Sequence, residues 1–292
     1  MNNQKKDLLT INVASIVLSL SSVVAKLSQI SSVAFILGRS MVVLPFFMLI
    51  CYIFKLFHPI ISRWHLLLIV VSGLLMGFHW SLFYESVKVS SIVVGVVTVH
   101  TYPLISAILE PLFFKQRLSF RQLLESGLVI VGIYIMSLGS VATGMLGLGI
   151  FFGLASAFLL ALRNIVTKQL VDCYSPILIM FFQVIISIFC LLPFGMTSLM
   201  QADGYHWQLI VVTGLVISGV GHTCYVKSMQ HLAATTVGIV ASFQIVYAAI
   251  YAYLFFGTIP QIYIIIGSLI ILVAVSAEQW VLFSKKDEQD TI

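Results

Sequence analysis

Long apolar runs separated by short polar breaks make up almost the whole chain. The runs lie near residues 8–25, 33–54, 65–84, 90–113, 122–139, 146–166, 176–198, 208–226, 233–256 and 262–283. Each is close to the roughly 20 residues that a helix needs to cross a bilayer. Because the runs lack the two-residue alternation of barrel strands, the pattern predicts an all-α membrane protein with ten transmembrane helices.

The composition argues against a soluble enzyme. Of the 292 residues, 60% are hydrophobic and 9% are charged, whereas a soluble domain has about 45–50% apolar and about 25% charged residues. The chain contains no P-loop, nucleophile–base set or metal-ligand spacing. We therefore expect no enzymatic activity, no cofactor and no metal. The net charge of +5 comes mainly from loops, so we expect no nucleic-acid partner.

Basic residues predict the orientation in the membrane. If the N-terminus is cytoplasmic, only Lys26 and Lys88 face outward, and Arg39 lies inside a span. The other twelve then belong to inner segments: Lys5, Lys6, Lys55, Arg63, Lys115, Arg117, Arg121, Arg163, Lys168, Lys227, Lys285 and Lys286. This excess follows the positive-inside rule. It predicts a multi-pass protein of the cell inner (cytoplasmic) membrane with both termini cytoplasmic.

One separation, 142 positions, relates the two halves of the chain. It pairs Lys26 with Lys168, Ser86 with Ser228, and the Leu-Phe-Phe segment at 112–114 with that at 254–256. We predict one five-helix repeat at residues 1–143 and a second at 144–292, which ends in a short charged tail. Because five is odd, the second repeat enters the membrane inverted. Inverted repeats are typical of transporters that bind substrate between the repeats.

Several motifs also point to a family. A run of small residues and a basic residue close the first helix of each half, at 21–26 (Ser-Ser-Val-Val-Ala-Lys) and 161–168 (Ala-Leu-Arg-Asn-Ile-Val-Thr-Lys). Arg39 comes early in the second helix, and Pro103 is central in the fourth. In these features and their order the chain resembles the EamA-domain members of the drug/metabolite transporter superfamily. The resemblance implies ten helices in two repeats and a transport function.

The chain departs from the family's Gly-Glu-Arg-Leu-Ser signature after the fourth helix. Gln116 and Thr258 stand where the family usually has glutamate. No role tied to that carboxylate therefore carries over. The superfamily moves amino acids, nucleobases and other metabolites, so the resemblance implies no single substrate.

Three histidines lie inside predicted spans, where insertion scales assign a charged side chain a cost of roughly 2.5–3.5 kcal/mol. His79 and His222 lie in the third helix of each half, within one residue of the repeat separation and beside glycines that allow close approach. His100 lies in the fourth helix. Each imidazole can either bond to a neighbouring helix or line a cavity. We predict that all three line a central substrate cavity.

Other side chains are predicted to complete the substrate site. They are Trp80, Tyr102, Gln244 and Tyr247, on the third, fourth and ninth helices. Core packing is the alternative role for each of them. Pro103 lacks the N–H of a helix interior, so we predict a kink there that serves gating.

Other charged residues in or near the spans have alternative interpretations. Arg39 either extends to the outer headgroups or pairs inside the protein with Glu85 or an anionic substrate group. Glu110 is interpreted as interfacial and paired with Arg117, and the alternative is a role in transport. The default interpretation of Glu85 and Lys88 is a surface ion pair, which contributes little to stability.

The sequence thus predicts a secondary active transporter, an exporter or exchanger, of a small organic metabolite such as an amino acid or nucleobase-type compound. It would work by alternating access. The alternatives are a channel-like facilitator, a non-transporting membrane protein and an intramembrane enzyme. The expected partners are the metabolite and the lipid bilayer, and the sequence leaves a homodimer open.

Overall fold

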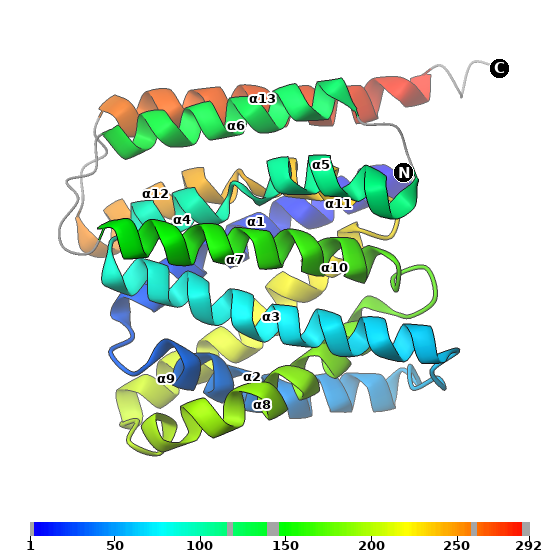
Figure 1. Ribbon diagram of the computed structural model, residues 1–292, viewed down its shortest axis with the longest axis vertical. Helices are drawn as coiled ribbons and strands as arrows, with labels where there is room; N and C mark the ends of the chain where they lie inside the picture. Colours follow the sequence, from blue (N-terminus) through cyan, green and yellow to red (C-terminus); the bar gives the residue numbers. More distant parts are fainter. Residues whose placement is uncertain (1–2, 116–118, 139–145, 258–261, 288–292) are drawn as a thin grey trace.

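The computed structural model describes residues 3–115, 119–138, 146–257 and 262–287, and all regular elements in these ranges are helices (Figure 1). Those of the first half are α1 Asn3–Leu27, α2 Ser32–Ile53, α3 Arg63–Val89, α4 Ile92–Val99, α5 Tyr102–Phe114 and α6 Phe120–Leu138. Those of the second half are α7 Leu146–Lys168, α8 Pro176–Met200, α9 Gly204–Val212, the π-helix η1 Thr213–His222, α10 Thr223–Ser228, α11 Ala234–Ala241, α12 Gln244–Phe256 and α13 Ile262–Asp287.

The polar breaks between apolar runs begin many of these helices. Ser31, Ser62, Ser91 and Asp203 precede α2, α3, α4 and α9, and each side chain accepts a hydrogen bond from the backbone N–H three residues later. Such caps satisfy N–H groups that a helix start leaves unpaired and contribute about 1 kcal/mol each. The breaks thus determine where the helices begin.

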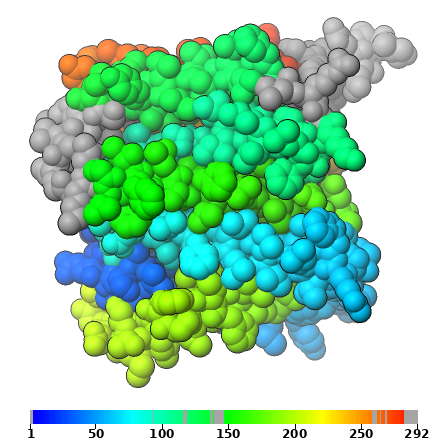
Figure 2. Space-filling model, in the orientation of Figure 1, coloured from blue at the N-terminus to red at the C-terminus, as the bar shows by residue number. Residues whose placement is uncertain are grey.

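Eight candidate membrane spans are present in the described residues, each long and apolar enough to cross a bilayer. They are Asn3–Leu27, Ser32–Ile53, Arg63–Val89, Val94–Phe114, Gly147–Lys168, Pro176–Met200, Gly204–Ser228 and Ala234–Phe256. The other two predicted spans are also helical, as α6 and α13, but do not belong to this set. Large hydrophobic side chains are exposed on most helices. Figure 2 shows one face of the molecule, over which α6, α5, α7, α3 and α8 follow one another from top to bottom. The chain is a multi-pass membrane protein.

Helices of the two halves pair with each other. Figure 1 shows α6 beside α13 along one side of the molecule and α2 beside α8 at the opposite side, and both pairs are in extensive contact. Arg121 of α6 forms ion pairs with Glu125 of its own helix and Glu278 of α13. Between these pairs lie α1, α3, α7 and the helices that are interrupted.

The separation of 142 residues found in the sequence also relates the backbones. Shifting α4 and α5 by 142 gives the bounds of α11 and α12, so both halves interrupt the same helix at the same place. The residues that follow these helices match too: Lys115 after α5 (φ 52°) and Gly257 after α12 (φ 64°) both have a left-handed backbone. The predicted boundary at 143/144 lies outside the described residues, as do Gln116 and Thr258.

The structure differs from the kink predicted at Pro103. The helix stops at Val99, and α5 begins at Tyr102 with Pro103 in its first turn. Proline is favoured there, because first-turn N–H groups have no partner within the helix. The equivalent residue in the second half is Ile245, in the first turn of α12. The break between α11 and α12 therefore forms without a proline. A proline is therefore not required for this break.

The two helix ends at Lys115 and Gly257 give a prediction on stability. A left-handed backbone costs an L-residue roughly 1–2 kcal/mol, whereas glycine adopts it freely. Lys115→Gly should therefore stabilise the protein by about 1 kcal/mol. Gly257→Ala should destabilise it similarly through the backbone alone, since nothing lies within 4 Å of the added Cβ. Thermal unfolding in detergent measures both. Lys115→Ala controls for the lost charge, and shifts of the same sign for both glycine exchanges would contradict the account.

Candidate functional site

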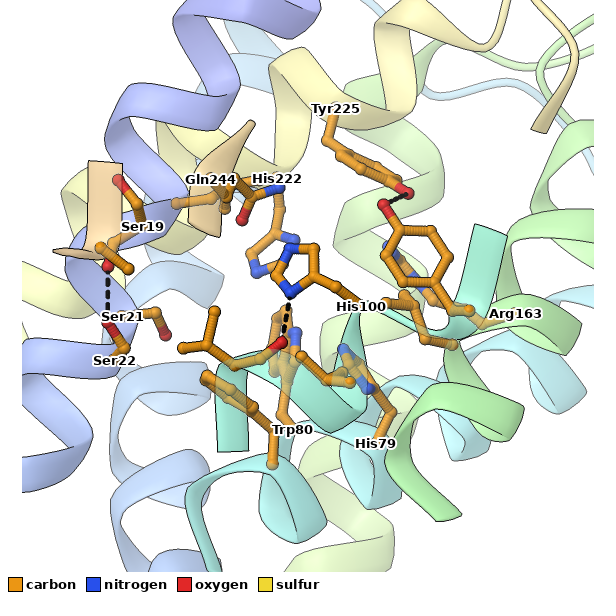
Figure 3. A pocket seen from close by; sticks show the side chains of 17 residues that line it. Ser19, Ser21, Ser22, His79, Trp80, His100, Arg163, His222, Tyr225 and Gln244 are labelled. Carbon is orange, nitrogen blue, oxygen red and sulfur yellow. Dashed lines mark hydrogen bonds between the residues drawn. The ribbon is translucent and has the colours of Figure 1, made fainter. Parts of the chain in front are cut away.

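A pocket lies between helices of the two halves (Figure 3). The empty space among its side chains is about 630 Å³, including the part that opens outward. Its walls are Leu18, Ser19, Ser21 and Ser22 of α1, His79, Trp80 and Phe83 of α3, Val96, Val99, His100 and Tyr102 around the α4–α5 break, Leu160 and Arg163 of α7, His222 and Tyr225 of η1 and α10, and Gln244 and Ala248 of α12.

The structure brings six of the seven predicted site residues together in these walls: His79, Trp80, His100, Tyr102, His222 and Gln244. Tyr247 is not a wall residue, and its ring packs edge-on against Phe243 at 4.9 Å. Ala248, one helical turn after Gln244, faces the pocket instead. That a substrate binds here stays a prediction.

His79 has both roles that the sequence left open. Its Nδ1 lies 2.8 Å from Ser156 Oγ and 3.1 Å from Ser156 O on α7. Ser156 Oγ donates its own proton to His79 O at 3.0 Å. In the contact between His79 Nδ1 and Ser156 Oγ, the donor is therefore Nδ1, which carries the proton. A neutral His79 then carries an unprotonated Nε2 that can accept a hydrogen bond. The residue joins α3 to α7 and also contributes an acceptor to the pocket wall.

His100 lies at the break between α4 and α5. Its Nδ1 donates to Val96 O at 2.7 Å, a bond drawn in Figure 3. The bond satisfies a carbonyl that the interrupted helix would otherwise leave with fewer partners. Because a carbonyl can only accept, the proton lies on Nδ1, and Nε2 is again the acceptor of the neutral ring.

A chain of hydroxyl groups crosses the pocket from α7 to α11. Asn164 Nδ2 donates to Tyr225 OH at 2.8 Å, Tyr225 OH donates to Tyr102 OH at 3.2 Å, and Tyr102 OH donates to Gly238 O at 3.3 Å. The middle bond is visible in Figure 3. These contacts fix the position of Tyr102 relative to both halves.

The ring of His222 packs on Trp80, with centroids 4.6 Å apart. The guanidinium carbon of Arg39 lies 3.8 Å from the centroid of the Trp80 ring. His222 is the last residue of η1, whose i→i+5 bonding is uncommon and is found often at functional sites. The nitrogens Nδ1 of His222 and Nε1 of Trp80 are buried without a hydrogen-bond partner.

Several interpretations of charged residues need correction. Arg39 is fully buried, so it does not reach the headgroups, and none of its nitrogens bonds to Glu85. Glu85 accepts a hydrogen bond from Ser32 Oγ at 2.7 Å instead, and Lys88 Nζ donates to a backbone carbonyl of the α1–α2 loop. Glu110 is buried rather than interfacial and binds the start of α11. Its expected partner Arg117 lies outside the described residues.

Arg163 is the main wall residue that sequence reasoning missed. It was assigned to an inner segment by the positive-inside count, yet it is 1% exposed and donates to Gln183 Oε1 at 2.7 Å. The signal was its position: Arg163 and Asn164 stand together inside a long apolar run. Two adjacent polar residues at such depth indicate an interior role.

Comparisons with known proteins agree with this architecture. The model of the EamA-like transporter family matches residues 5–138 and 147–277, which is most of the chain in two separate parts. The chain belongs to the EamA-like transporter family. This EamA-like transporter is 22% identical over 217 residues to the uncharacterized transporter YxxF of Bacillus subtilis (strain 168), which covers 72% of this chain and 68% of that protein. A solved crystal structure superposes with a TM-score of 0.73 at 13% identity over 96% of each chain, a likeness that supports the fold alone.

Proposed function

We propose that this EamA-like transporter is a secondary carrier of a small organic metabolite and that the pocket is its substrate site. The observation that carries the proposal is a pairing of wall residues across the repeat. Pairs separated by 142 positions are Leu18 with Leu160, Ser21 with Arg163, Trp80 with His222, Phe83 with Tyr225, and Tyr102 with Gln244. A pocket built from equivalent positions of two repeats lies at their interface, where repeat-built carriers bind substrate.

The interrupted helices support alternating access. The α4–α5 and α11–α12 breaks are equivalent in the two halves, and Val99, His100 and Gln244 at their edges line the pocket. Interrupted helices at corresponding places of both halves are typical of carrier binding sites. Rocking of one half against the other about these breaks would expose the pocket to each side in turn.

We further propose that α6 and α13 complete ten transmembrane helices in two inverted five-helix repeats, at residues 1–143 and 144–292. The two helices begin 142 positions apart and pack along each other. Arg163 is buried and is removed from the sequence-based count of inner basic residues. The count then falls from twelve to eleven, against Lys26 and Lys88 on the outer side. This distribution supports an inner-membrane location with both termini cytoplasmic.

Counterflow in proteoliposomes tests the carrier. A thermal-shift screen of amino acids, nucleobases, nucleosides and sulfonium compounds first supplies a ligand, since binding to the folded state raises its stability. We expect uptake of the labelled ligand to be stimulated by unlabelled ligand on the other side. Ser21→Trp should fill the pocket and reduce this exchange at least about tenfold, because the indole occupies the substrate's volume.

Leu9→Trp is the matched control, since it lies on the same helix but is 60% exposed on the outer surface. It should exchange at the wild-type rate. Uptake without stimulation would indicate a channel-like facilitator. Full exchange by Ser21→Trp would place the substrate site elsewhere.

A further inference from the structure

Two arginine side chains are enclosed in the centre of the protein. Arg163 is 1% exposed and lines the pocket, and Arg39 is 0% exposed and lies against Trp80 in the pocket wall. Both guanidiniums are within electrostatic range of His79 and of His222. The pocket walls thus hold one guanidinium and three imidazoles, and a second guanidinium lies against the Trp80 ring. Among the described residues, none of those in its walls is acidic.

Neither arginine has a carboxylate partner within the described residues. None of the ion pairs in these ranges involves Arg39 or Arg163, and the nearby groups that interact with them are the uncharged hydroxyls of Tyr84 and Tyr225, respectively. The buried carboxylates of that part of the chain are engaged elsewhere: Asp7 with His231, Glu110 with Ala234 and Thr235, and Glu125 and Glu278 with Arg121. A buried charge is costly unless an opposite charge compensates it.

Hydrogen-bond donors around the pocket also lack acceptors. Among the described residues, Nε of Arg163 and Nε1 of Trp80 are buried with no hydrogen-bond partner, and the guanidinium of Arg39 has none at hydrogen-bond distance, with only the hydroxyl of Tyr84 nearby. Arginine and tryptophan nitrogens can only donate. The missing partner is therefore rich in acceptor oxygens and negatively charged. A cationic ligand would instead face two like charges.

We propose that the pocket takes an organic anion, whose carboxylate is held by Arg163 and attracted by the charge of Arg39 behind Trp80. Arginine binds carboxylates well because its planar fork matches both oxygens. The planar or apolar body of the ligand packs against Trp80 and His222. Its hydroxyl hydrogens meet the acceptor nitrogens of His79 and His100. The inference rests on the proposed function, in which this pocket is the transport site.

Three ligands with the same phenyl ring and different charge test the inference. They are 3-phenylpropionate (an anion), L-phenylalanine (a zwitterion) and 2-phenylethylamine (a cation). The full chain carrying Trp64→Phe, Trp207→Phe and Trp280→Phe keeps Trp80 as its single indole, so its fluorescence reports the pocket. We expect the Kd of the anion to be at least about tenfold lower than that of either other ligand at neutral pH.

Substitution of Arg163 separates charge from shape. Arg163→Gln should remove the preference for the anion, and Arg163→Lys, which keeps the charge, should retain part of it. Lys227→Gln removes an exposed charge and should leave the preference unchanged. Equal or tighter binding of the zwitterion or cation, or no response of Trp80 to any of the three ligands, would overturn the anion inference. The proposed function would survive either result if Ser21→Trp still blocked counterflow of the screened ligand.

Discussion

Glu110→Ala is expected to destabilise the protein by about 3 kcal/mol or more. Glu110 Oε1 accepts the backbone N–H of Ala234 at 2.8 Å, and Oε2 accepts the backbone N–H of Thr235 at 2.8 Å and its hydroxyl at 2.6 Å. Bonds to a charged group contribute about 1.5–3 kcal/mol each, and buried donors without partners are costly. A carboxylate at a helix start also complements the positive end of the helix dipole.

The location of these bonds makes the expected loss larger than that of an ordinary cap. Ser91 caps α4 with its own side chain, but the equivalent residue before α11 is Ala233, which has no side-chain cap. Glu110 of the first half supplies the cap to the second half. Its loss should therefore reduce transport as well as the melting temperature in detergent. Glu85→Ala, which loses one bond from Ser32, is the control and should shift the melting temperature less. A melting temperature of Glu110→Ala equal to that of the wild type would refute this role.

Gly153→Ala is the second change with a large expected effect. A Cβ atom there would overlap Thr98 Oγ1 and lie 2.6 Å from Thr98 Cβ and 3.0 Å from Ser86 Oγ. Overpacking of this kind costs roughly 1–3 kcal/mol, and here it would push α4 away from α7. Because α4 ends beside His100 at the pocket, we expect lower exchange and a lower melting temperature.

Gly147→Ala is the matched control for that change. It lies on the same helix with nothing within 4 Å of the added Cβ, so it should be neutral or stabilise by up to about 1 kcal/mol through helix propensity. A second variant, Gly153→Ala with Thr98→Gly, should recover part of the loss. Equal melting temperatures for Gly153→Ala and Gly147→Ala would mean that α4 and α7 can separate without cost.

Much of the candidate site could be predicted because polar side chains inside apolar runs are costly. His79, His100 and His222 stood out for this reason, and the repeat separation suggested that they meet. Arg39 and Arg163 were equally unusual inside apolar runs, but the sequence left Arg39 open between the headgroups and the interior and assigned Arg163 to an inner segment. The contacts decide this, and they join helices that are far apart in the chain.

For the fold, too, local features could be predicted from the sequence and contacts between distant residues could not. Apolar runs predicted the helices well, because this signal acts within a few tens of residues. The partner of Glu110 lies 124 residues away, and no local pattern indicates such a contact. The π-helical bonding of η1 was likewise not predicted, and the helix is interrupted just before the kink predicted at Pro103.

The pairing of wall residues across the repeat has a consequence for how a ligand is oriented. The backbones are related by the repeat, but the paired side chains differ: Ser21 corresponds to Arg163, Trp80 to His222, and Tyr102 to Gln244. A ligand turned end for end would meet a different set of groups. In a substrate site of the proposed kind, this asymmetry would distinguish the two ends of a ligand, and a duplicate of either half alone would lack that selectivity.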